Sequence, residues 1–395
     1  MKLKKITFPL LSFFCLLLSV FDTYSQTTKT PELYLEPIFK VNYGDATADK
    51  PQSKSWTNKH GQWLLVGDED GPKLLKKDIS GWASQTSINQ ALQALPSRAD
   101  VLIKGDEAHI VLVDDCALTV VQLTYTHDLK QYEHQSKVNL PIPEKCNTIE
   151  TATITLDSKN EFWVCADMNE SIMVWHSVNG KDWSKPFVLA ADINKDDISL
   201  VVGLKNQISV IWSNQNTASI VERIHYDGDA PQQWSAPVIV QQGDNNADDH
   251  LNATVFENGE MALVTKNSVD KMNAPQFVLR LRNVEGKWTN IPYENLTKQR
   301  SPSRPIINHI VSGKIFEIHS VRNRENNQYF ISVNEIVKKN NEWQFKELMQ
   351  LKTKIKGKNG DVTSSKASFL PHQAKLIFFS DDLGNVYSFD LDTLL

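Results

Sequence analysis

The segment Asp248-Asp249-His250 is the part of the chain best suited to acid–base chemistry. A neighbouring carboxylate orients an imidazole and raises its pKa, and a second acid can hold a substrate. We therefore predict a catalytic group in which His250 is the general base and Asp248 and Asp249 are its acidic partners. Two alternatives stay open, because the same side chains could bind a metal ion or form a polar turn that caps a strand. We assign no metal ligands, and the sequence identifies no cofactor.

Cations from distant parts of the chain form a second candidate group. Arginine grips a planar anion through two hydrogen bonds, and lysine adds a point charge. Together they would suit a uronate carboxylate, a sialate or a sulfate ester. The alternative is that each lysine pairs with a nearby carboxylate and locks adjacent parts of the fold. The residues that we predict to bind substrate are Lys54, Gln52, Arg98, Asn252, Lys266, Arg304 and Lys366.

These residues can only meet if the fold brings distant segments together, and an aromatic repeat indicates such a fold. A bulky aromatic returns about every fifty residues, mostly on a polar turn after a β-rich run. A period of this length, with short strands inside it, is typical of a β-propeller, in which each repeat is one four-stranded blade. We expect the tryptophans of this repeat to wedge between blades. Trp56 and Trp63 are expected to pack in the core, with stacking on a sugar ring as the alternative. The repeating aromatics are Trp82, Tyr132, Trp183, Trp234, Trp288 and Trp343.

Dividing the chain by this period gives about seven repeats, so we predict an all-β, seven-bladed propeller. Residues 375–380 and 385–391 supply two strands of a last blade, but the chain stops before a fourth. The strand-like segment 32–43 has no blade of its own, so we expect it to close the last blade. Residues 87–95 favour a helical turn, and the lysine-rich tract 352–358 is interpreted as a solvated loop.

One turn resembles a known family of propellers. The run Ser177-Val178-Asn179-Gly180-Lys181-Asp182-Trp183 is similar to the Asp-box turn of sialidase-like (BNR/Asp-box) propellers, although it is one residue short and has Asn179 in place of Asp. The resemblance implies the fold of this superfamily of secreted bacterial propellers. A true sialidase would need an arginine triad and a tyrosine nucleophile, which the chain does not offer in the segments expected to enter the inner strands of the blades. Other sialidase-like propellers are polysaccharide lyases and rhamnosidases that act on uronate-containing glycans.

The N-terminus and the charge of the chain limit its location and partners. Three lysines followed by the apolar run 6–20 predict a signal peptide over residues 1–25, a single propeller domain over 26–395, and a periplasmic or extracellular protein. No later run is long enough to span a membrane, and a net charge of −5 disfavours nucleic acid. Cys116, Cys146 and Cys165 allow one disulfide at most, and we prefer buried thiols at Cys116 and Cys165.

These observations favour a secreted, monomeric propeller that recognises an acidic polysaccharide or oligosaccharide at its central funnel. We predict that it processes this glycan, as a polysaccharide lyase or a glycoside hydrolase. In a lyase, Arg304 or Lys266 would neutralise the uronate and His250 would take the adjacent proton. The alternative is a non-catalytic propeller that binds glycan or protein at the same place, because a fold alone does not confer activity.

Overall fold

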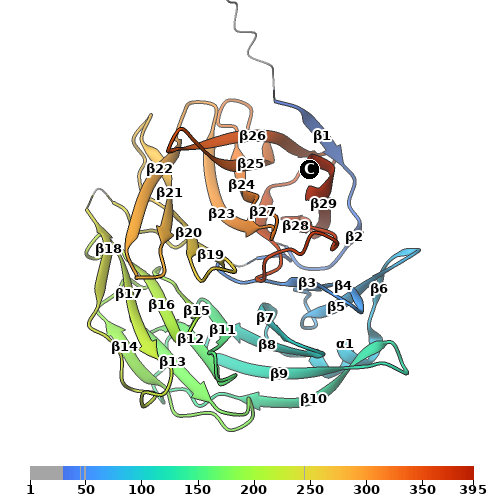
Figure 1. Cartoon of the computed structure of the whole chain (residues 1–395). Coiled ribbons are helices and arrows are strands. Elements are labelled where there is room, and N and C mark those ends of the chain that lie inside the picture. Colours follow the sequence, from blue (N-terminus) through green and yellow to red (C-terminus); the bar gives the residue numbers. More distant parts are fainter. Residues whose placement is uncertain (1–29, 45, 49, 244) are drawn as a thin grey trace, which may run out of the picture.

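The computed structural model describes residues 30–44, 46–48, 50–243 and 245–395 as a ring of seven β-sheets (Figure 1). The predicted seven-bladed propeller is confirmed. The predicted signal peptide, residues 1–25, lies outside the described residues. In the described part of the chain, no helix is long and apolar enough to cross a membrane.

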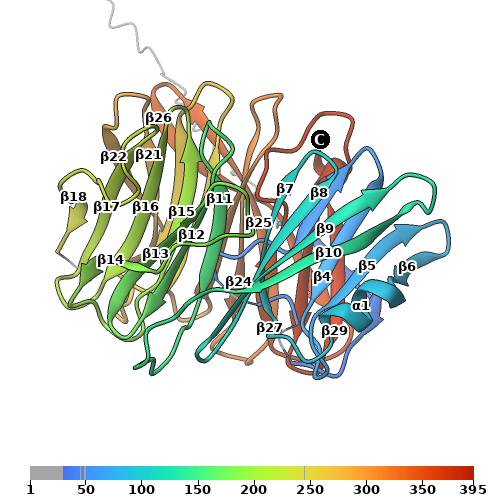
Figure 2. The same cartoon turned by 90° about the horizontal axis from the view of Figure 1, so that it is seen from below.

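Blades one to five are antiparallel sheets whose strands follow one another in chain order from the central channel outward, and blades six and seven each add one N-terminal strand at the outer edge (Figure 1 and Figure 2). Blade one contains β3 (Ser55–Asn58), β4 (Gly61–Val66), β5 (Lys73–Asp78) and β6 (Gly81–Ser84). Blade two contains β7 (Arg98–Lys104), β8 (Glu107–Asp114), β9 (Ala117–Thr126) and β10 (Gln131–Asn139). Blade three contains β11 (Ala152–Leu156), β12 (Phe162–Met168), β13 (Ser171–Ser177) and β14 (Phe187–Ala191). Blade four contains β15 (Ser199–Leu204), β16 (Gln207–Asn214), β17 (Ser219–Tyr226) and β18 (Val238–Gln242).

The remaining blades use both ends of the chain. Blade five contains β19 (Leu251–Val255), β20 (Met261–Lys266), β21 (Pro275–Arg282) and β22 (Trp288–Asn295). Blade six contains β23 (Ser301–His309), β24 (Ile315–Arg322), β25 (Tyr329–Lys339), β26 (Glu342–Thr353) and β1 (Glu32–Leu35). Blade seven contains β27 (Asn359–Thr363), β28 (Leu376–Asp381), β29 (Asn385–Asp390) and β2 (Phe39–Lys40), and a short 3₁₀ turn, η1 (Leu391–Leu394), ends the chain.

The N-terminal segment closes the ring, as predicted, but it does so in two steps. Phe39 and Lys40 pair antiparallel with β29 and complete blade seven. Before that, Glu32–Leu35 pairs parallel with β26 and adds a fifth strand to blade six. This parallel pairing differs from the prediction that the whole segment completes the last blade. Strand β26 is long and would otherwise present an unpaired outer edge, which β1 covers.

The core is divided among the blade interfaces. Seven hydrophobic clusters of the described chain each lie between two neighbouring blades. The second strand of a blade is covered on both faces, which explains continuous apolar runs such as residues 162–166 of β12. The predicted tryptophan wedges are confirmed, because the repeating tryptophans pack against clusters between blades. Tyr132, the tyrosine of the repeat, is also fully buried between blades one and two. Trp56 and Trp63 are buried in the core, also as predicted.

Two local predictions have different outcomes. The helical turn expected over residues 87–95 is present as α1 (Thr86–Leu92), which buries Ile88 and Leu92 between blades one and two. The preferred interpretation of Cys116 as a buried thiol is wrong, because Cys116 forms a disulfide with Cys146. Among the described cysteines, Cys165 is free and buried, and burial raises the pKa of its thiol to about 12, so it is an unreactive packing group.

Candidate functional site

Loops that are far apart in the sequence meet at one end of the central channel. The Lys50 ammonium lies 2.8 Å from an Asp249 carboxylate oxygen and also pairs with Glu150. The Lys50 backbone N–H donates to Asp361 over 3.0 Å. Lys50, Glu150 and Asp249 lead into the inner strands of blades one, three and five, and Asp361 lies in the inner strand of blade seven, so distant segments converge as predicted. We define the mouth cluster as Lys50, Glu150, Asp248, Asp249, His250, Lys266, Arg304 and Asp361.

The predicted catalytic segment lies in this cluster as an ion network. Nδ1 of His250 is 3.1 Å from Asp248 Oδ1 and 2.5 Å from Asp249 Oδ1. Lys266 Nζ donates to the other oxygen of Asp248 over 2.7 Å. The imidazole is buried, and its Nε2 has no hydrogen-bond partner among the described residues. His250 therefore lies beneath the mouth surface and holds both carboxylates in place.

Charge pairing sets the protonation states in this network. Burial favours neutral His250, but the hydrogen bonds that His250 donates to the Asp248 and Asp249 carboxylates outweigh this effect and raise the pKa of His250 above its usual value. Burial would also raise the pKa of Asp249, yet the hydrogen bond from His250 holds that pKa well below its ordinary range. Both carboxylates therefore favour the protonated form of the imidazole, which faces an ionised Asp249. A protonated imidazole cannot accept a proton, which makes it better suited to orienting these carboxylates than to acting as a base.

Glu150 belongs to the mouth cluster but is not among the predicted site residues. Its side chain is 24% exposed, and burial, with the nearby charges of Asp167 and Asp196, raises its pKa to about 7 although Lys50 opposes the shift. Carboxylate oxygens of Glu150, Asp196 and Asp249 lie within 4.8 Å of one another. A carboxyl group that titrates near neutrality beside an ionised one is typical of acid–base sites. Its position just before the inner strand of blade three was the available signal.

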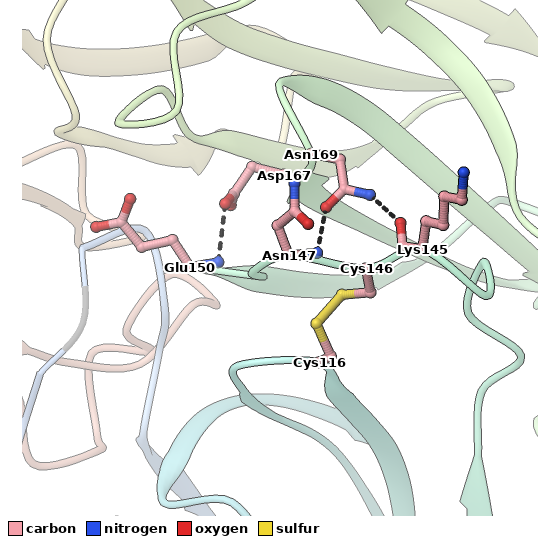
Figure 3. Close-up of a disulfide and its surroundings, with 7 residues drawn as sticks. All are labelled: Cys116, Lys145, Cys146, Asn147, Glu150, Asp167 and Asn169. Carbon is pink, nitrogen blue, oxygen red and sulfur yellow. Dashed lines mark hydrogen bonds between the residues drawn. A yellow bond between two sulfur atoms is a disulfide. The ribbon is translucent and has the colours of Figure 1, made fainter.

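The disulfide fixes the segment that carries Glu150. Figure 3 shows Cys116 bonded to Cys146, and Asn169 bridging this segment through the Asn147 backbone N–H and the Lys145 carbonyl. Asp167 then accepts the Glu150 backbone N–H over 2.9 Å. Blades two and three therefore both hold the backbone just before the inner strand of blade three. This arrangement limits how far the Glu150 carboxyl can move.

Arg304 is the most exposed cation of the mouth cluster. Its side chain is 44% exposed, and its Nε pairs with the buried carboxylate of Asp361. Arg304 has a φ of 58°, at an irregularity in the pairing of β23 with β24, and Lys50 has a φ of 46°. Such left-handed backbone costs about 1–3 kcal/mol for a non-glycine residue and often occurs at functional sites. The fold thus keeps two mouth cations in strained positions.

Four of the predicted substrate-binding residues lie deeper in the channel. Lys54 is fully buried, and its Nζ is 3.5 Å from Gln52 Oε1, while Gln52 Nε2 donates to the Ala152 carbonyl over 3.0 Å. Asn252 accepts the Ile307 backbone N–H over 3.0 Å and so connects the inner strands of blades five and six. Lys366 follows β27 instead of leading into it, and its Nζ pairs with Asp100 and the Ile154 carbonyl inside the channel.

Arg98 lies between the mouth cluster and the residues along the channel wall. Its guanidinium donates to the Glu150 carbonyl over 3.1 Å, so it supports the mouth from below. The structure therefore brings together Asp248, Asp249, His250, Lys266 and Arg304, and places Gln52, Lys54, Asn252 and Lys366 along the channel wall. A cavity of about 360 Å³ extends along this wall, lined by all seven inner strands or the residues next to them.

The mouth carboxylates could in principle hold a cation, since ligand atoms of Asp248, Asp249 and His250 lie within 4.8 Å of one another. In the structure, however, Lys50, Lys266 and the protonated His250 already neutralise these carboxylates. A metal ion would have to displace them. The donor set therefore fits an ion-paired acid–base site better than a metal centre.

Comparisons with known proteins agree on the fold. No protein-family model matches the chain, and no curated protein matches it. Among solved structures, a polysaccharide lyase of family PL25, an ulvan lyase bound to a [GlcA(1-4)Rha3S] glycan, is 10% identical, with 89% of this chain and 96% of that chain covered and a TM-score of 0.52. A second structure of the PL25 ulvan lyase is 9% identical at the same coverage, with a TM-score of 0.50. At this identity the likeness shows a shared propeller fold.

Proposed function

We propose that this protein is a secreted enzyme of the sialidase-like propeller superfamily that processes an acidic glycan at the mouth cluster. The observation that carries the proposal is the combination of Glu150, whose pKa is about 7, with the ionised Asp249 and the exposed Arg304. The PL25 lyase, which shares the fold, is bound to a glucuronate-containing glycan. The Cys116–Cys146 disulfide supports export, because disulfides persist in oxidising compartments.

A β-elimination of a uronate-containing glycan fits these groups best. Arg304 and Lys266 neutralise the uronate carboxylate, which makes the adjacent C5 proton more acidic. Ionised Glu150 accepts this proton, the C4–O bond breaks, and its electrons leave with the glycosidic oxygen as the C4=C5 double bond forms. The leaving oxygen takes a proton from water or from a mouth acid. Asp248, Asp249 and His250 hold the surrounding charges in place.

The close approach of Glu150 and Asp249 favours a second candidate, a retaining glycoside hydrolase. Retaining enzymes place two carboxyl groups about 5–5.5 Å apart, one as acid and the other as nucleophile. Oxygens of these two residues lie within 4.8 Å. In this case protonated Glu150 is the acid and Asp249 is the nucleophile, with the Lys50 side chain displaced from between them.

The pH dependence of kcat/KM separates the two chemistries. A lyase needs Glu150 ionised, so its rate rises with pH through about 7; a hydrolase needs Glu150 protonated, so its rate falls through the same value. The mature protein is assayed on a panel of uronate-containing and sulfated glycans, with absorbance of unsaturated uronate and release of reducing ends as readouts. Unsaturated product identifies elimination, and reducing ends without it identify hydrolysis.

Glu150→Gln removes the titrating group while keeping its size. We expect turnover to fall by about 10²–10⁴-fold, the usual effect of losing a general acid or base. The matched control is Glu144→Gln, an exposed position in the same connection between blades two and three. Full activity of Glu150→Gln would contradict the assignment of Glu150. Tight binding of an acidic glycan with no product from any substrate would instead support the alternative of a non-catalytic binding module.

A further inference from the structure

Two histidines and one aspartate meet at the end of the ring opposite the mouth. Inner strands run away from the mouth cluster, so the turns that follow them lie on the far face. His60 is in the turn between β3 and β4 of blade one, Asp106 is in the turn between β7 and β8 of blade two, and His127 follows β9. None of these residues takes part in the proposed glycan site.

The two imidazoles point the same ring nitrogen at one carboxylate. His60 Nε2 lies 2.9 Å from Asp106 Oδ1, and His127 Nε2 lies 3.0 Å from Asp106 Oδ2. The three ligand atoms lie within 4.8 Å of one another. A zinc ion with ligand distances of about 2.0–2.2 Å needs tetrahedral ligands roughly 3.3–3.5 Å apart, so small side-chain movements would be enough to admit it.

The surroundings keep this arrangement in place. The His60 side chain is only 7% exposed, and its ring stacks on the Tyr125 ring with centroids 3.7 Å apart and planes 10° from parallel. The Asp106 backbone carbonyl accepts the Tyr125 N–H over 2.8 Å, which fixes the turn that carries the carboxylate. His127 is 63% exposed and leaves one side open to solvent. His60 and Asp106 are therefore held in place before an ion binds, and the exposed His127 side chain can move to complete the site.

We propose that His60, Asp106 and His127 bind a divalent transition-metal ion of the zinc type and so join blades one and two at the far face. Imidazole nitrogen with one carboxylate oxygen is a donor set that zinc, nickel and copper prefer, whereas calcium and magnesium prefer oxygen alone. Lys59, whose Nζ is 3.0 Å from Asp106 Oδ1, must leave. The Lys59 side chain is 67% exposed, so it can rotate away into the solvent, and the loss of this exposed ion pair costs little free energy. Three protein ligands leave a fourth position for water.

The test is calorimetric titration of chelator-treated mature protein with zinc chloride, and with calcium chloride as the hard-ion control. We expect one zinc equivalent, no calcium binding at this site, and a zinc-dependent rise in melting temperature, because an ion that binds only the folded state stabilises it. His127→Ala should remove both signals, and it should fold because the side chain is exposed. His134→Ala, an exposed histidine on β10 of blade two, is the matched control and should keep both.

Several outcomes would overturn the proposal. The first is that addition of zinc produces no heat of binding and no change in the melting temperature. The signals could also persist in His127→Ala and disappear in Asp249→Asn, which would place the ion in the mouth cluster. As a spectroscopic check, cobalt(II) in place of zinc should give visible absorption bands of a four-coordinate site in the wild type and in His134→Ala. The same bands in His127→Ala would contradict the assigned ligands.

Discussion

The mouth cluster contains four acidic and four basic side chains, and most of them form ion pairs with one another. Asp248 is held by Lys266 and His250, Asp249 by His250 and Lys50, and Asp361 pairs with Arg304. Lys50 keeps its charge, because Asp249 and Glu150 outweigh the effect of burial and raise its pKa. Arg304 is the best exposed of these cations. An incoming carboxylate or sulfate would therefore meet Arg304 first.

Replacing Arg304 tests this role. Arg304→Gln removes the charge and the planar fork, and a hydrogen bond to a charged group contributes about 1.5–3 kcal/mol. We therefore expect the affinity for a glucuronate-containing oligosaccharide to fall by roughly 10–100-fold, measured by isothermal titration. Arg324→Gln, an exposed arginine in the loop between β24 and β25, is the control and should bind as the wild type does. Equal affinity of the two variants would show that Arg304 does not contact the anion.

Side-chain roles were less predictable from the sequence than side-chain positions. The pattern Asp-Asp-His correctly indicated a charged cluster, but the protonated state of His250 depends on two carboxylates converging on one nitrogen. No sequence motif marks Glu150. Its pKa of about 7 results from burial and from charges on other loops, which become neighbours only in the folded protein. Lys366, expected to bind substrate together with the other cations, follows β27, which ends at Thr363, and its side chain lies in the channel.

At the scale of elements, turns and connections position the site. The turn that resembles an Asp box is held together by an asparagine: Asn179 Oδ1 accepts the backbone N–H groups of Lys181 and Asp182 over 2.8 and 2.9 Å. Asn179 Nδ2 also donates to the Asp182 carboxylate over 2.8 Å. An aspartate at 179 would face that carboxylate and be repelled by it. The departure from the pattern is thus explained by the acid three residues later.

The connection from blade two to blade three is the element on which Glu150 depends. The disulfide spans 30 residues, for which loop-entropy estimates give a stabilisation of about 3–4 kcal/mol. We expect Cys116→Ser with Cys146→Ser to lower the melting temperature and, by loosening Glu150, to reduce turnover more than affinity. Cys165→Ser, in a blade interface and outside this connection, is the control for loss of a cysteine. Unchanged turnover in the double variant would show that the disulfide does not position Glu150.

At the scale of the whole molecule, the aromatic period predicted the number of blades because each repeat must bury one face against its neighbour. Every blade interface has its own cluster, so the periodic pattern carries most of the core. The two-step N-terminal closure was not predictable in full. A four-residue strand such as Glu32–Leu35 has too little pattern to specify its partner, and its pairing with β26 depends on which sheet edge lies within reach.

The N-terminal closure should decide the stability of the entire ring. Ile38 and Val41 donate backbone N–H groups to blade seven over 2.8 and 2.9 Å, and both side chains, with Phe39, pack between blades seven and one. Buried side chains of this size contribute about 1.5–3 kcal/mol each, so removing residues 26–43 should cost roughly 3–6 kcal/mol, with allowance for partial exposure. Opening the ring also exposes the edges of β29 and β26.

We therefore expect the truncated protein to melt at a clearly lower temperature in one cooperative transition, followed by circular dichroism. One transition is expected because the blades are coupled around the ring, and an open edge weakens the interfaces on both sides of it. A variant that lacks only residues 26–29 is the control, since β1 and β2 remain, and it should melt as the mature protein does. A melting temperature that the longer deletion leaves unchanged would mean that blades one to seven hold together without β2.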